Sequence, residues 1–337
     1  MTQASAIDPE RRAQLEKARL ATLVRERFGV SDADPGTAID AATLVSGATG
    51  WFAPSPGKSS ALGPALAWAR QQGVSELHVI AENDAGVIAR RAGAFAAPPV
   101  IWAVQGRELS PARPVPHEPL PEPPGDIDHL VDLLLDAGAE VVVEHGVVTG
   151  EILGLEVARV VVEGDAAPRL DVGVGRHDRE AFAMMHGEVP TPVALEKVVS
   201  AVREQRRPGA ASHPLTRLSR ARWLRSTLRA DPARVGLVSM RSIPGIDPVT
   251  DLRNPAPAAA LGVDAEGASV LVVCSVGIDL ELVPVAADLR AREASEAGEP
   301  RIVLVMPERD AHPVTRALAE QLTEPAQVVP VEGEWGS

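Results

Sequence analysis

The pattern of hydrophobic and polar residues switches between helical and strand spacing along most of the chain, which indicates an α/β protein. Residues 8–29 carry apolar side chains at helical spacing and begin with Asp8 and Pro9, a common start of a helix. Farther along, short apolar runs predict strands and Ala-rich segments predict helices. The predicted strands lie within 38–54 and at 76–81 and 99–106, and the predicted helices lie at 60–73 and 84–95. We therefore predict an N-terminal α/β domain over residues 1–107.

Residues 108–126 interrupt this pattern because they are rich in proline. Proline fixes φ and has no backbone N–H, so the segment cannot continue as a helix or as a central strand. We predict a stiff, extended linker here and a domain boundary.

A central α/β segment is predicted over residues 127–234. Its expected elements are a helix at 126–138, strands at 139–146, 150–164 and 169–175, and helices at 178–187 and 191–207. Residues 203–234 are rich in arginine and are expected to be all-helical. This segment is either a solvated helical surface that packs through its leucines, or a surface for nucleic acid or another acidic partner. Under the second interpretation, Arg217, Arg220 and Arg225 are the predicted nucleic-acid contacts.

The C-terminal segment, residues 235–337, again predicts an α/β domain. Its expected strands are at 257–263, 269–277, 301–307 and 326–333, and its expected helices are at 282–294 and 312–322. Residues 77–106 and 302–333 both run from an apolar strand through an acidic turn, an Ala-rich helix and a Pro-marked loop to another apolar strand. This correspondence predicts an internal duplication.

Composition and charge narrow the class of protein. The chain has 337 residues, which is long enough for several domains with sizeable cores, and a formal net charge of −13. That charge argues against a protein whose whole surface binds nucleic acid, although a local basic surface remains possible. The single cysteine, Cys274, excludes an internal disulfide and agrees with a reducing compartment. No apolar run approaches the length of a membrane helix, so we expect a cytoplasmic protein without a membrane partner.

Glu156 is the most informative acidic residue of the central segment. In a continuous strand over 150–164 it shares a face with Ile152, Ala158 and Val160, where a carboxylate is costly unless it is paired or metal-bound. If the following strand pairs with this one as a hairpin, Asp171 can approach Glu156. Two close carboxylates suit a hard cation such as Mg²⁺ or Mn²⁺. The structural alternative is an ion pair of Glu156 with a nearby arginine, and the candidates are Arg159, Arg176 and Arg179.

Residues 154–182, "GLEVARVVVEGDAAPRLDVGVGRHDREAF", resemble the core of the PD-(D/E)xK nuclease superfamily, especially its RecB-like members. That family places one acidic residue on a strand, a second acidic residue on the next strand and a lysine shortly after it. Glu156 matches the first acidic position, Asp171 matches the second, and Gly173 stands at the lysine position. The resemblance implies restriction-endonuclease-like cores with mixed sheets. It also implies catalytic and metal-binding roles for Glu156 and Asp171, with Glu151 or Glu144 as a further ligand.

The C-terminal segment resembles the same core more generally, but Cys274 and Val276 occupy its acidic and lysine positions. Three functions therefore stay open. The first is a degenerate nuclease fold with a non-catalytic binding or assembly role, which the glycine at the lysine position favours. The second is a Mg²⁺- or Mn²⁺-dependent nuclease or phosphodiesterase that uses Glu156 and Asp171. The third is an unrelated α/β enzyme or small-molecule binder with its site between the duplicated halves. A histidine–aspartate pair at His177 and Asp178 is a weaker motif, because the further ligands of a metal-dependent hydrolase are not identifiable.

Overall fold

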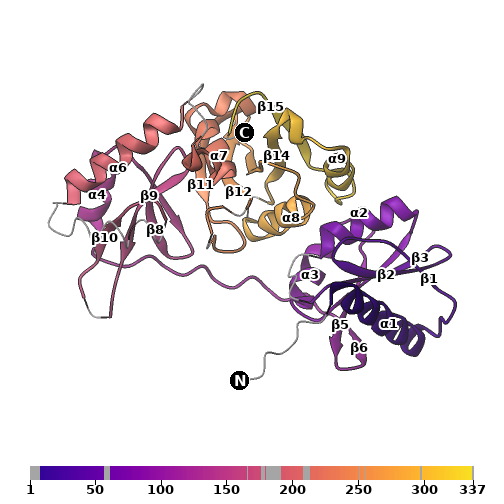
Figure 1. The fold of residues 1–337 in the computed structure, drawn as a ribbon. Helices are drawn as coiled ribbons and strands as arrows, with labels where there is room; N and C mark the ends of the chain where they lie inside the picture. The colour runs from indigo at the N-terminus through magenta and orange to yellow at the C-terminus, as the bar shows by residue number, and fades with distance from the viewer. Residues whose placement is uncertain are drawn as a thin grey trace, which may run out of the picture. The chain divides into compact units, whose positions relative to one another are not determined.

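A computed structural model of the protein describes residues 8–56, 61–164, 166–175, 179, 191–207, 213–249, 251–253, 255–296 and 298–335. These residues form a mixed α/β fold with three separate β-sheets (Figure 1). The chain divides into two compact units. The first unit comprises Met1–His117, Leu280–Asp288 and Pro313–Pro325, and the second comprises Glu118–Asp279, Leu289–His312 and Ala326–Ser337. The helix expected at 178–187 lies outside the described residues except for Arg179. His177 also lies outside them.

The first unit contains a six-stranded sheet in the order β1-β2-β3-β4-β5-β6. Its strands are β1 (Asp34–Pro35), β2 (Ala41–Ser46), β3 (Thr49–Pro54), β4 (Glu76–Ala81), β5 (Val100–Gln105) and β6 (Glu108–Pro111). Its helices are α1 (Pro9–Phe28), α2 (Leu62–Gln72) and α3 (Ala85–Ala92). Helix α1 begins at the proline that the sequence indicated, and it buries Leu20, Leu23 and Val24 with Trp51 of β3 and Trp102 of β5.

The proline-rich segment differs from the prediction at its start. Residues 108–111 form β6, which pairs antiparallel with β5, because a proline is tolerated at the end of an edge strand. The remaining residues, up to the next helix, contain no helix or strand. The change from the first unit to the second falls inside this stretch, between His117 and Glu118.

Two segments from the C-terminal part of the chain complete the first unit. They contribute the first part of α8 (Leu282–Arg292) and α9 (Pro313–Glu320). The side chain of Asp288 on α8 is fully buried, and its carboxylate accepts hydrogen bonds from Arg90 Nε at 2.7 Å and Arg91 Nε at 2.9 Å. Burial alone would raise the pKa of Asp288, but the hydrogen bonds from the two arginines hold it below its ordinary value. Local sequence cannot predict this arrangement, because the partners lie almost 200 residues apart.

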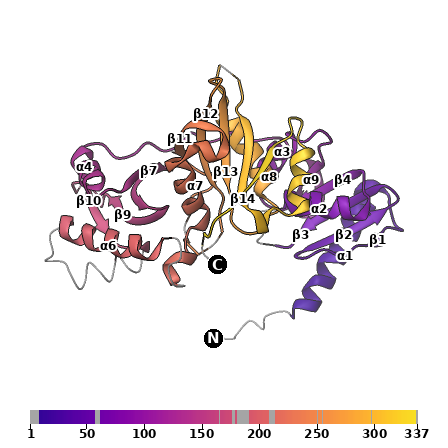
Figure 2. The same ribbon diagram turned by 90° about the horizontal axis from the view of Figure 1, so that it is seen from above.

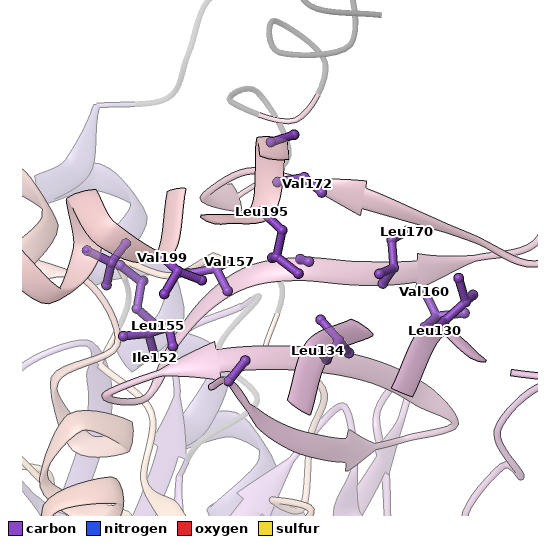
Figure 3. Close-up of a cluster of buried hydrophobic side chains, with 14 of the residues drawn as sticks. Leu130, Leu134, Ile152, Leu155, Val157, Val160, Leu170, Val172, Leu195 and Val199 are labelled. Atoms are coloured by element: carbon purple, nitrogen blue, oxygen red, sulfur yellow. The ribbon is translucent and has the colours of Figure 1, made fainter. Parts of the chain in front are cut away.

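The second unit contains an antiparallel four-stranded sheet in the order β10-β9-β8-β7. Its strands are β7 (Glu140–Glu144), β8 (Val147–Ile152), β9 (Leu155–Val161) and β10 (Arg169–Val172). Two helices, α4 (Asp128–Asp136) and α6 (Thr191–Gln205), pack on one face of this sheet (Figure 1). Figure 3 shows Leu134 and Leu195 from these helices among Val157, Val160 and Leu170 from the strands. The hydrophobic core therefore occupies one face of the sheet, and the other face carries polar residues together with the buried Val142.

The single strand predicted over 150–164 is wrong, because the chain reverses at Leu153 and Gly154. Both residues have positive φ, 48° and 73°, which gives the tight two-residue turn of a β-hairpin. Leucine is an unusual residue in such a turn, so the sequence carries no Asn-Gly or Asp-Gly signal there. The turn presents Leu153 to two hydrophobic clusters at once, one under α6 and one under α7 (Arg220–Ala230).

A third, five-stranded sheet has the order β11-β12-β13-β14-β15. Its strands are β11 (Leu237–Ile243), β12 (Ala258–Asp264), β13 (Ser269–Cys274), β14 (Arg301–Pro307) and β15 (Gln327–Val331). The first three strands are antiparallel and the last three are parallel, as in β1 to β5 of the first sheet. This shared succession is the structural counterpart of the sequence correspondence, while a common origin stays a prediction.

Most of the arginine-rich segment that the structure describes is helical, but residues 206–207, 213, 218–219 and 231 are not. Its short helices are η1 (Pro214–Arg217) and η2 (Pro232–Val235), on either side of α7. Helix α7 packs against the third sheet (Figure 2). Its Leu224 and Leu228 are completely buried. In the part of the chain that the structure describes, no helix has the length and apolar content needed to cross a membrane.

Candidate functional site

The polar face of the four-stranded sheet carries four glutamates, Glu140, Glu144, Glu151 and Glu156, which we call the carboxylate face. Glu140 pairs with Glu151 across β7 and β8, and Glu151 pairs with Glu156 across β8 and β9, so these three form one cross-strand row. Glu144 lies on the same face as Glu140, since alternate residues of a strand share a face. Glu151 is 1% exposed and Glu156 is 4% exposed. A carboxylate buried to this extent destabilises the fold unless a hydrogen-bond or ion-pair partner compensates its charge.

A β-bulge in β9 turns Glu156 toward this face. The pairing register shifts between Gly150 and Glu151, which leaves Val157 as an extra residue in β9. Simple alternation put Glu156 beside Ile152, Ala158 and Val160, and that expectation is wrong. Glu156 instead shares its face with Arg159, while Val157 and Ala158 both enter the hydrophobic core.

Two arginines neutralise Glu156. Arg159 donates from Nε to Oε1 at 3.0 Å and from Nη2 to Oε2 at 2.8 Å. Arg179 donates to Oε1 as well. Both carboxylate oxygens are thus hydrogen-bonded to guanidinium groups, which compensates the cost of burying the charge. Arg159 and Arg179 are two of the three arginines that the structural alternative named.

Asp171 lies in a different environment. Strands β9 and β10 pair antiparallel, as expected, but the register places Asp171 opposite Arg159 rather than opposite Glu156. Its Oδ1 accepts a hydrogen bond from Arg169 Nε at 3.1 Å, and its side chain is 34% exposed. The structure therefore brings Asp171 to an arginine-bearing part of the sheet and does not pair it with Glu156.

Glu144 and Glu151 are held by arginines of α7. Arg222 donates to both carboxylates. Arg225 donates from Nη1 to Glu144 Oε1 at 2.9 Å and from Nη2 to Glu151 Oε2 at 3.3 Å. Arg229, one turn farther along, forms an ion pair with Glu140, with 2.8 Å between Nε and Oε1. Arg222, Arg225 and Arg229 lie three and four residues apart, on one side of the helix, and we call them the arginine stripe.

The pKa values follow from this arrangement. Burial would raise the pKa of Glu151, but Arg222 and Arg225 lower it below its ordinary value. Burial would likewise lower the pKa of Arg225, but Glu151 and Glu144 raise it above its ordinary value. Both groups are therefore held in their charged forms.

The three predicted nucleic-acid contacts do not share one surface. Arg225 is 1% exposed, and its guanidinium is already bound to two glutamates and to the carbonyl of Ala259, so it is not presented to a phosphate. Arg217 is exposed and Arg220 is half-buried. Sequence reasoning did not foresee the structural role of the arginine stripe, although its helical spacing was a usable signal.

Arg206 is a second arginine with a structural role. Its guanidinium donates to the carbonyls of Leu153 at 2.7 Å and Leu215 at 3.0 Å, and to that of Leu218. It also lies over the ring of Trp223, 5.0 Å from the centroid. Burial lowers the pKa of Arg206 to about 9, against the opposing effect of Glu151. Arg206 thus links the β8–β9 turn to the segment before α7 through hydrogen bonds to backbone carbonyls of both.

The carboxylate face does not have the form of a divalent-metal site. Within the described ranges, no three His, Cys, Asp or Glu residues form a group suited to holding a metal ion. The oxygens of Glu151 and Glu156 that Mg²⁺ or Mn²⁺ would require are hydrogen-bonded to arginines. We therefore derive no chemistry through a metal at this face.

Comparison of the chain with protein-family models, with curated proteins and with solved structures finds no match. The resemblance to PD-(D/E)xK nucleases consequently stays a prediction from the sequence.

Proposed function

We propose that the protein is a non-catalytic binding or assembly protein, built on a degenerate nuclease-like fold with duplicated α/β domains. The observation that carries the proposal is the neutralisation of the carboxylate face. Glu144, Glu151 and Glu156 all form hydrogen-bonded ion pairs with arginines. A metal-dependent nuclease needs carboxylates that are free to bind the metal, whereas a binding protein can use the same residues to fix one helix against a sheet.

Gly173 gives independent support. It has a φ of 141°, and a Cβ atom added there would lie 2.9 Å from the backbone nitrogen of Arg179. A lysine at this position, which the nuclease family requires, would be strained and would displace Arg179, a partner of Glu156. The local backbone is therefore adapted to the glycine.

Two further aspects belong to the same proposal. We place the protein in the cytoplasm, which the single, fully buried Cys274 supports. We also retain nucleic acid as a candidate partner, through arginines outside the arginine stripe. Arg217 is one of these, since its side chain is exposed.

The test is a cleavage assay on single- and double-stranded DNA and RNA with Mg²⁺ or Mn²⁺. It compares the wild type with Glu156→Gln, Asp171→Asn and the matched control Glu266→Gln, an exposed acid between β12 and β13. We expect no cleavage that depends on Glu156 or Asp171. Metal-dependent cleavage that is lost in both site variants and kept in the control would overturn the proposal and establish the nuclease.

A further inference from the structure

A pocket lies at the N-terminal end of α7, within the second unit. The pocket is partly open to solvent. Its walls come from the start of α7, from the chain after β13, and from Val249, Leu252, Arg253, Pro255 and Ala256. The polar residues that matter here are Arg217, Ser219, Arg220, Arg253, Ser275 and Asp279.

The pocket is rich in positive charge, although the chain as a whole has a formal charge of −13. Arg217 and Arg253 are exposed, and no described residue forms an ion pair with either guanidinium. Arg220 adds a third guanidinium, and Asp279 supplies a carboxylate. Guanidinium groups bind phosphate oxygens in a planar, two-pronged geometry, so this set of residues suits an anion.

The start of α7 reinforces that preference. Its cap residue is Ser219, whose side chain forms no capping hydrogen bond, and its first turn contains no acidic residue. The Oγ of Ser219 is buried and has no hydrogen-bond partner among the described residues. A serine at this position normally accepts a hydrogen bond from the first turn of its helix. The helix start therefore places the positive end of its dipole beside the pocket, with the unpartnered Oγ of Ser219 at the cap position.

We propose that this pocket binds the phosphate group of a nucleotide. The proposal rests on the binding function proposed above and names its ligand class. Arg217 and Arg253 bind the phosphate oxygens from the open side, and the N-terminal end of α7 with Ser219 binds them from the other. The apolar side chains of Leu252 and Val276 line the same pocket and offer contacts for the rest of the nucleotide.

The test is isothermal titration calorimetry of the whole protein with inorganic phosphate, adenosine 5′-monophosphate and adenosine. The double variant Arg217→Gln/Arg253→Gln removes the two exposed guanidiniums. Arg241→Gln is the matched control, because Arg241 is an exposed arginine on β11 outside the pocket. All three arginines are at the surface, so the variants are expected to keep the wild-type melting temperature.

We expect saturable one-to-one binding of phosphate and of the monophosphate. Their affinity should fall about tenfold or more in the double variant and stay unchanged in Arg241→Gln. Adenosine should bind at least about tenfold more weakly than its monophosphate. No saturable binding by the wild type, or equal binding by the double variant, would overturn the proposal.

A short single-stranded RNA without terminal phosphates distinguishes the two sources of the phosphate. If the RNA displaces the monophosphate and is itself weakened in the double variant, the ligand is a phosphate within a strand. If it does not displace the monophosphate, the ligand is a free nucleotide. The calorimetry tests the phosphate site, and the cleavage assay tests the non-catalytic function. Neither result determines the other, so the failure of one proposal can be told from the failure of the other.

Discussion

Glu151 and Glu156 lie directly opposite each other on neighbouring strands, and both are almost completely buried. Two carboxylates in that position repel each other and would take up protons unless cations lay beside them. Arg159 and Arg179 form ion pairs with Glu156. Arg222 and Arg225 form ion pairs with Glu151. The arginines thus compensate the buried charges of these glutamates, and the ion pairs of Glu151 join the sheet to α7.

Acid should weaken this network. Since the pKa of Glu151 is lowered in the folded state, its contribution to stability is complete above its ordinary value of 4.5 and is lost as the pH falls through the folded-state pKa. We expect the free energy of unfolding of the wild type to decrease as the pH drops below about 4.5. In Glu151→Gln the decrease should be less steep. Urea unfolding at a series of pH values measures both slopes. Identical slopes would show that Glu151 is not held ionised by its arginines.

Removal of Arg225 should be costly at every pH near neutrality. Arg225→Met leaves the carboxylates of Glu144 and Glu151 buried with one guanidinium fewer, and we expect a loss of about 3 kcal/mol in the free energy of unfolding. Arg241→Met, at an exposed position, should change it by less than about 0.5 kcal/mol. Equal effects of the two substitutions in urea unfolding would mean that the buried ion pairs add nothing to stability.

At the scale of elements, the β8–β9 turn and α7 depend on each other. Gly154 has a φ of 73°, and a Cβ atom there would lie 2.2 Å from the backbone carbon of Arg222. The turn therefore approaches the backbone of α7 as closely as a glycine allows. Because Arg222 also binds Glu144 and Glu151, the contact at Gly154 and the ion pairs support the same position of the helix.

Gly154→Ala should consequently destabilise the protein by more than the strain of a positive φ, which costs about 1–2 kcal/mol by itself. Gly267→Ala is the matched control, because Gly267 has a φ of 84° and no atom within 4 Å of the added Cβ. The difference between the two variants in thermal or urea unfolding isolates the close approach to α7. If both variants lose the same stability, the turn and the helix are not tightly packed.

The sequence predicted most elements and missed those that depend on distant contacts. Helix α1 was predictable because Asp8 and Pro9 mark its start, and the strands of the parallel regions were predictable as short apolar runs. The turn at Leu153 was not predictable, because leucine occupies it for its packing rather than for its backbone preference. Strand β11 was missed because most of its middle residues are at least partly exposed and break the apolar alternation.

The sequence likewise predicted part of the candidate site and missed the part that depends on distant contacts. Glu156 could be singled out because a carboxylate among apolar strand residues needs a partner. Its bulge could not be foreseen, since a bulge depends on the pairing of two strands rather than on one of them. The partners of Glu151 lie more than 70 residues away on α7, and no local pattern links them.

At the scale of the whole molecule, the first unit is assembled from three separate stretches of the chain. Arg90 and Arg91 on α3 need Asp288, and the backbone N–H of Gly63 at the start of α2 donates to Glu281 Oε1 at 2.8 Å. A fragment that ends at His117 lacks both acids, so Arg90 and Arg91 lose their carboxylate partner. The stability of the unit therefore depends in part on residues far along the chain.

We accordingly expect the fragment 1–117 to unfold at a clearly lower temperature than the full chain, or to show no cooperative transition. Asp288→Asn in the full chain should shift the transition of the first unit in the same direction, because Arg90 and Arg91 lose their charged partner. Circular dichroism during heating measures both. A fragment as stable as the intact protein would show that the unit does not need its C-terminal segments.

Both oxygens of Glu156 accept hydrogen bonds from arginines, and we propose that they hold no metal ion. Calorimetric titration of the wild type with Mn²⁺, beside Glu156→Gln and Asp171→Asn, tests this proposal. We predict no saturable Mn²⁺ binding that depends on Glu156 or Asp171, because every oxygen of Glu156 already accepts a hydrogen bond from a guanidinium. Stoichiometric Mn²⁺ binding to the wild type that disappears in either variant would contradict the claim and identify these residues as a metal site.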